Sequence, residues 1–142
     1  MKASWLLEAG IAGLVFYAGL RYVPFPGKIS GCSMNPTIHD GDWAIINFVL
    51  PPRSIELGDL VVMAYNENNE NKKFLKRIVA VEGRTVPLHC GVPYRLKEGE
   101  YWLEGDNKDE SYDGRYFGPV PESKIIKKVI GVVCHHEEHP SP

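Results

Sequence analysis

Apolar and polar residues divide the chain into an apolar N-terminal stretch, a series of short strands and a polar tail. After residue 40, runs rich in β-branched and aromatic residues alternate with clusters of Gly, Pro, Asn and Asp, which is typical of strands joined by turns. Several of these runs are apolar on both faces, which favours a mainly β, folded-over antiparallel sheet resembling a barrel. The predicted strands are Asp42–Leu50, Asp59–Tyr65, Phe74–Val81, Tyr101–Glu104 and Ile125–Val133.

The N-terminal stretch, Trp5 to Leu20, is apolar except for Glu8. Its 16 residues fall short of the roughly 20 that a full membrane span needs, although residues before Pro26 can extend it. The pattern alone leaves three possibilities open, which are a membrane anchor, a cleaved signal peptide and a helix that packs on the domain. The segment from Val23 to Ile29 then reads as a short linker.

Three polar or irregular segments carry no predicted chemistry. We expect a solvated loop at Asn66–Lys73 and an irregular stretch at Val86–Gly99. The tail, residues 135–142, contains His135, His136 and His139, but a zinc site needs a defined geometry with further ligands, so we expect a solvated terminus and no metal.

Composition narrows the class of protein. A chain of 142 residues that is 44% hydrophobic and 24% charged suits one globular domain. A nucleic-acid-binding surface would show as clustered Lys and Arg, and the net charge of −2 offers no such excess. We therefore expect no nucleic-acid partner. Cys32, Cys90 and Cys134 are odd in number and widely spaced, which fits neither a disulfide framework nor a metal motif.

Two residues suggest covalent catalysis. Ser33 lies in the run Gly-Cys-Ser-Met-Asn-Pro-Thr, and Lys76 opens the apolar run Lys-Arg-Ile-Val-Ala-Val-Glu-Gly. A serine becomes nucleophilic when a neighbouring base takes its proton, and a lysine is a base only when its amine is neutral. Residues 74, 76, 78 and 80 share one strand face, so the Lys76 amine is expected among hydrocarbon, where desolvation lowers its pKa. Taken alone, Lys76 and Arg77 would more ordinarily be a solvated pair.

A third segment favours the catalytic interpretation of Lys76 over a solvated pair. It begins with Gly105-Asp106-Asn107 and continues with Ser111, Asp113, Arg115 and Phe117-Gly118-Pro119-Val120. With all three segments in order, the chain resembles the type I signal peptidases, a family of membrane-bound Ser/Lys endopeptidases that remove targeting peptides. The resemblance runs from the N-terminal apolar stretch to the last strand. It implies an uncleaved anchor helix at residues 1–22, followed by a catalytic β domain at residues 23–134.

The resemblance also assigns roles to residues. It implies that Ser33 is the nucleophile and supplies an oxyanion donor through its backbone N–H, with Met34 packed beside the site. Lys76 would be the general base. Ser111 would orient the lysine amine, and Asp113 and Arg115 would form a charged pair that supports the third segment.

Two positions depart from the family pattern. Gly31 lies where many bacterial members have a serine that completes the oxyanion hole, whereas organellar members commonly have glycine. Gly114 replaces the usual serine between Asp113 and Arg115, and we expect it to add backbone freedom with little effect on the chemistry.

The resemblance therefore predicts an endopeptidase without a cofactor, which acts on precursor proteins at a lipid membrane. The short length and Gly31 are most similar to the mitochondrial inner membrane protease, whose two homologous subunits face the intermembrane space. A bacterial leader peptidase of the plasma membrane is the first alternative. A self-cleaving repressor is disfavoured because it would need a DNA-binding domain, and the sequence before Ser33 does not suggest one. An inactive partner subunit is disfavoured by the intact Ser33 and Lys76.

Overall fold

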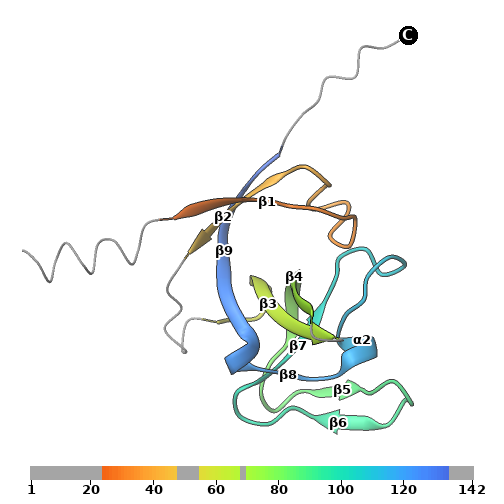
Figure 1. Cartoon of the computed structure of the whole chain (residues 1–142). Helices are drawn as coiled ribbons and strands as arrows, with labels where there is room; N and C mark the ends of the chain where they lie inside the picture. The colour runs from red at the N-terminus through yellow and green to blue at the C-terminus, as the bar shows by residue number, and fades with distance from the viewer. Residues whose placement is uncertain (1–23, 48–54, 68–69, 135–142) are drawn as a thin grey trace, which may run out of the picture.

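The computed structural model describes residues 24–47, 55–67 and 70–134. Its main feature is a seven-stranded antiparallel sheet in the order β1-β2-β9-β3-β4-β7-β8, beside a two-stranded sheet of β5 and β6 (Figure 1). The strands are β1 Phe25–Lys28, β2 Trp43–Asn47, β3 Leu60–Glu67, β4 Glu70–Ala80, β5 Thr85–Pro87, β6 Pro93–Arg95, β7 Glu100–Glu104, β8 Val120–Pro121 and β9 Ile125–Val133. Two short helices, α2 Gly114–Phe117 and the 3-10 helix η2 Glu122–Lys124, precede β8 and β9 respectively.

The prediction of a mainly β antiparallel fold is confirmed. The long strand β9 arches from β2 to β3, so it joins the first and middle parts of a strongly curved sheet (Figure 1). Among the described strands, β1 and β8 are the two edges of this sheet. The curvature therefore encloses a core without a closed ring of hydrogen-bonded strands.

The segment predicted as a linker contains a strand. β1 pairs with β2, with Phe25 opposite Ile46 and Lys28 opposite Trp43. A proline is tolerated here because β1 is an edge strand, where a missing N–H can face away from the ladder. The prediction of a linker was wrong because prolines argue against a central strand but are compatible with an edge strand.

The predicted polar loop at residues 66–73 is wrong for most of its length. β3 and β4 continue through it, and their register pairs Tyr65 with Lys72 and residue 67 with residue 70. Lys72 and Lys73 are exposed while their backbone is in the ladder. The polar side chains of this segment indicate that it is exposed to water, but its extended conformation is set by pairing with the neighbouring strand.

The stretch predicted as irregular, residues 86–99, contains part of a small hairpin. β5 and β6 pair with Val86 opposite Tyr94. This hairpin covers a small core of its own, made of Ala80, Val86, Leu96 and Trp102. Three-residue strands give too short a pattern for alternation to be recognised in the sequence.

The face of β4 that we predicted to be apolar is turned into the protein. Lys76 and Ile78 are buried, and Ile78 belongs to the main core together with Val61, Met63 and Leu103. Val79, on the alternate face, is exposed. The strand therefore carries a lysine into the interior, as the two-residue periodicity required.

The predicted anchor, residues 1–22, and the tail, residues 135–142, lie outside the described residues. Among the residues that the structure describes, no helix is long and apolar enough to cross a membrane. The limits of the predicted catalytic domain, residues 23–134, stay a prediction.

Gly114 has a packing role that differs from the one expected. A Cβ at this position would lie 2.8 Å from the Leu103 carbonyl oxygen and 3.1 Å from the Trp102 ring. Its φ is not in the left-handed region, so backbone freedom does not explain the glycine. Glycine is required because α2 approaches β7 closely.

We predict that Gly114→Ala lowers the free energy of unfolding by about 1–3 kcal/mol, because the added methyl overpacks the contact between α2 and β7. Gly131→Ala is the matched control, since a Cβ there would meet Ile45 at an ordinary 3.6 Å. It should change stability by less than about 0.5 kcal/mol. Urea denaturation of the two full-length variants measures both values, and equal stabilities would contradict the packing argument.

Candidate active site

The segment that carries Ser33 connects β1 to β2 and is anchored by two buried side chains. Met34 is 1% exposed and Ile38 is fully buried. The backbone N–H of Ile38 donates to the Met34 carbonyl at 3.0 Å, and that of Asn35 donates to Cys32 at 3.1 Å. These turns fix the backbone on both sides of Ser33, so its hydroxyl has a defined direction.

The structure brings Ser33 and Lys76 together. Lys76 Nζ donates to Ser33 Oγ at 2.8 Å, although the two residues are 43 positions apart in the sequence. Lys76 is only 2% exposed, and the residue opposite it on β3 is the fully buried Val61. A serine hydroxyl is thus within proton-transfer distance of an amine that is shielded from water.

Burial has the expected electrostatic consequence for the amine. Desolvation is the largest influence and lowers the pKa of Lys76 below the ordinary lysine value. The carboxylate of Asp113 acts in the opposite direction and raises this pKa, while the guanidinium of Arg115 lowers it. Desolvation prevails, and the neutral amine is available at a lower pH than in an exposed lysine.

Asp113 and Arg115 form the predicted charged pair. Arg115 Nε donates to Asp113 Oδ1 at 2.9 Å, and Arg115 Nη2 donates to Asp113 Oδ2 at 3.0 Å. Asp113 is fully buried, and its carboxylate also accepts from the backbone N–H of Gly105 at 2.9 Å. Burial alone would raise the pKa of Asp113, but the hydrogen bonds from Arg115 and Gly105 outweigh it and lower the pKa.

Ser111 lies beside the site but does not make the hydrogen bond that the family resemblance implies. Its hydroxyl is buried and has no regular hydrogen-bond partner among the described residues. It is close enough to the Asp113 carboxylate to help lower the pKa of that group. The amine of Lys76 bonds to Ser33 and not to Ser111 in this structure.

Gly105 lets Ser111 and the segment of Ser33 approach each other closely. A Cβ on Gly105 would lie 2.2 Å from Ser111 Oγ and 2.5 Å from the Ser33 carbonyl oxygen. Both atoms approach the Gly105 backbone more closely than any larger residue permits. The glycine was visible in the sequence as part of the third segment, but only the structure shows that close approach requires it.

Arg77 and Asp106 form a second charged pair that sequence reasoning did not identify. Arg77 Nε and Nη2 donate to the two Asp106 oxygens at 2.9 and 2.7 Å, and Nη1 donates to the Gly58 carbonyl at 2.9 Å. Hydrogen bonds from Arg77, followed by one from Thr37, lower the pKa of Asp106 despite its partial burial. The adjacency of Arg77 to Lys76 was the available signal.

Asn107 connects that second pair to the segment of Ser33. Its backbone N–H donates to the Ser33 carbonyl at 3.0 Å, and its side-chain amide donates to the Cys32 carbonyl at 3.1 Å. We call Arg77, Asp106 and Asn107 the clamp. The clamp joins the strand of Lys76 to the segment of Ser33.

Gly31 and Cys32 precede Ser33. Gly31 has φ +99°, a left-handed conformation that favours glycine, and its N–H donates to Asp40 Oδ1 at 2.7 Å. Cys32 Sγ donates to a Glu110 carboxylate oxygen at 2.8 Å, and this bond raises the pKa of the thiol. A protonated thiol is a poor nucleophile, so this hydrogen bond makes Cys32 less reactive.

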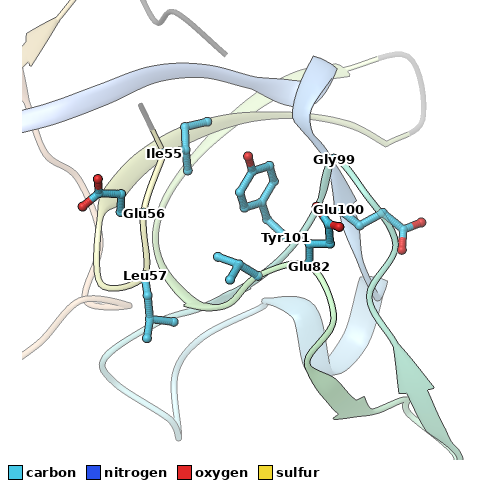
Figure 2. A pocket seen from close by; sticks show the side chains of 8 residues that line it. Ile55, Glu56, Leu57, Glu82, Gly99, Glu100 and Tyr101 are labelled. Atoms are coloured by element: carbon cyan, nitrogen blue, oxygen red, sulfur yellow. The ribbon is translucent and has the colours of Figure 1, made fainter. Parts of the chain in front are cut away.

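A separate pocket of about 370 Å³ lies near the end of β4, and Figure 2 shows it from close by. Apolar side chains and three carboxylates line it, but none of the residues of the candidate active site does. Its lining residues are Ile55, Glu56, Leu57, Val81, Glu82, Gly99, Glu100 and Tyr101. Within the described part of the chain, no group of His, Cys, Asp and Glu side chains could hold a metal ion.

Comparisons with known proteins find similarity to signal peptidases and to a mitochondrial protease subunit. The chain is 35% identical over 113 residues to mitochondrial inner membrane protease subunit 1 of Schizosaccharomyces pombe, an alignment that covers 75% of this chain and 71% of the relative. It is 25% identical over 167 residues to signal peptidase IB of Staphylococcus aureus, covering 89% and 86% of the two chains. A crystal structure of a signal peptidase I from Enterococcus faecalis matches with a TM-score of 0.40 and 20% identity, covering 57% of this chain and 97% of that one.

The family model for signal peptidase, peptidase S26, matches residues 2–92 and 87–134. The two matches together include all three segments that carry the resemblance. This chain therefore belongs to the signal peptidase family, peptidase S26, a family of serine endopeptidases.

Proposed function

We propose that this protein is a membrane-bound serine endopeptidase that removes targeting or sorting peptides from precursor proteins with a Ser33/Lys76 dyad. The observation that supports it most is the 2.8 Å contact between Lys76 Nζ and Ser33 Oγ inside a buried strand face. Membership of the signal peptidase family supports precursor proteins as the class of substrate.

In the proposed reaction, the neutral amine of Lys76 takes the proton of Ser33 while Oγ attacks the scissile carbonyl. The backbone N–H of Ser33 stabilises the oxyanion, and the leaving amine of the substrate departs with a proton returned by Lys76. Lys76 then deprotonates a water molecule that hydrolyses the acyl-enzyme. Ser111, Asp113 and Arg115 support the geometry and transfer no proton.

The substrate is proposed to bind as an added strand, since an extended peptide gains main-chain hydrogen bonds along a sheet edge. The family resemblance suggests small residues before the cleaved bond. Shallow apolar pockets near Met34 and the strand of Phe74–Val81 would accept them.

We further propose that the protein works in the mitochondrial inner membrane, with the catalytic domain facing the intermembrane space and a second homologous subunit as partner. The 35% identity to a mitochondrial inner membrane protease subunit and the glycine at position 31 support this location. The similarity to signal peptidase IB favours a bacterial-type leader peptidase as the second candidate. The cleavage sites of precursors that accumulate without this protein would distinguish the two locations.

We expect Ser33→Ala to reduce precursor cleavage to background and Lys76→Ala to reduce kcat/KM by about 10²–10⁴-fold, the usual contribution of a general base. Ser123→Ala and Lys124→Ala, both at exposed positions, should retain activity. The assay follows cleavage of a precursor by the full-length protein in detergent, alone and with its partner subunit. Full cleavage by Ser33→Ala only in the presence of the partner subunit would indicate that the chain acts as a non-catalytic partner, and cleavage by Ser33→Ala alone would exclude Ser33 as the nucleophile.

The pH profile tests the base directly. Because only the neutral amine accepts a proton, kcat/KM should rise with pH as Lys76 deprotonates. Because the pKa of Lys76 is lowered, this rise should lie below the ordinary lysine pKa of 10.5. Initial rates measured across the pH range give the midpoint, and a profile without this acid limb would argue against a lysine base.

The clamp should matter for both stability and rate. Asp106→Asn removes the charge that accepts two hydrogen bonds from Arg77, so we expect a loss of about 1.5–3 kcal/mol in unfolding free energy. Displacement of Ser33 by about 1 Å would lower kcat about 10²-fold. Asp109→Asn, at an exposed position of the same segment, is the control, and equal behaviour of the two variants would contradict a role for the clamp.

A further inference from the structure

Five aromatic residues gather beside the candidate active site, and we call them the aromatic cluster. They come from β3, β4, the segment after Ser111, and α2. The ring centroids of neighbouring members are 5.3–6.4 Å apart, within the range of favourable aromatic pairs. The members are Tyr65, Phe74, Tyr112, Tyr116 and Phe117.

Phe74 is the member that contacts Lys76. The two residues share one face of β4, and Lys76 Nζ lies over the Phe74 ring, 5.7 Å from its centroid. The ring itself is held by Tyr65 at 5.6 Å and by Tyr112 at 6.4 Å in an edge arrangement. The hydroxyls of Tyr65 and Tyr112 are 3.1 Å apart and hydrogen-bond to each other. Phe74 therefore presents a fixed ring face to the amine.

A ring face attracts an ammonium and has no comparable attraction for a neutral amine. The charged groups that act on Lys76 are Asp113, which favours the ammonium, and Arg115, which disfavours it. The residue across from Lys76 on β3 is Val61, which has no charge. Phe74 and Asp113 therefore both favour the charged ammonium form of Lys76, whereas desolvation and Arg115 favour the neutral amine.

We infer that Phe74 is a positioning residue for the base, whose ring face holds the Lys76 ammonium against Ser33 once the amine has taken the serine proton. This inference rests on the proposed function. It assigns the ring a role in the step where positive charge appears at Nζ. Leucine in its place would keep the apolar surroundings and remove the ring face.

The test compares the acid limb of kcat/KM in Phe74→Leu and in the unsubstituted protein. Loss of the ring face should shift the midpoint to lower pH by about 0.4–1.5 units. Phe74→Tyr keeps a ring and should restore the original midpoint. Phe117→Leu is the matched control, because its ring packs on Tyr65 and Tyr112 within the same cluster. It should leave the midpoint unchanged even where it lowers stability.

A second measurement does not depend on cleavage. In full-length protein carrying ¹³C-labelled lysine, the Lys76 resonance, identified by its loss in Lys76→Arg, reports the protonation of the amine by NMR. The midpoint of this titration should move down in Phe74→Leu by the same amount. An unchanged titration would overturn the inference. Cleavage that survives Ser33→Ala would instead overturn the proposed function and leave the titration interpretable.

Discussion

The burial of one lysine amine beside one serine hydroxyl is the constraint on which the rest of the structure depends. A charged ammonium in this position would lose its hydration, and the surrounding strands offer mainly hydrocarbon. The amine tolerates the site because it can be neutral and because Ser33 Oγ lies 2.8 Å away. An apolar residue at position 76 would suit the core better, so the lysine costs stability, and the proposed reaction accounts for that cost.

The two arginine–aspartate pairs hold three segments around this contact without adding much net charge to it. The pair of Asp113 and Arg115 shows why this matters, since its two members shift the pKa of Lys76 in opposite directions. Burial therefore remains the dominant influence on the amine. The pair of Arg77 and Asp106 holds β4 against the segment of Ser33, because Asp106 precedes Asn107, which bonds to the backbone of that segment.

The sequence allowed prediction of those features that follow from local pattern or from a motif. The inward face of β4 followed from alternation, and β9 has the predicted limits, Ile125–Val133. Features that depend on long-range pairing were missed, such as the strand β1 in a proline-rich segment and the continuation of β3 and β4 through polar residues. The need for glycine at position 105 was hidden for the same reason, since Ser33 and Ser111 meet it only in the folded chain.

Gly31 links the backbone geometry of this segment to the proposed reaction. At φ +99°, a residue with a side chain is strained by about 1–2 kcal/mol, whereas glycine is not. The N–H of Gly31 is already bonded to Asp40, so it cannot also serve an oxyanion. Glycine thus avoids backbone strain in the turn, but it has no hydroxyl that could donate to an oxyanion. The loss of one oxyanion donor typically costs about 2.7–4 kcal/mol of transition-state stabilisation. For the proposed reaction, this places the greater share of oxyanion stabilisation on the Ser33 N–H. Asn107 of the clamp fixes the direction of this N–H, because its side chain donates to the Cys32 carbonyl of the same planar peptide unit.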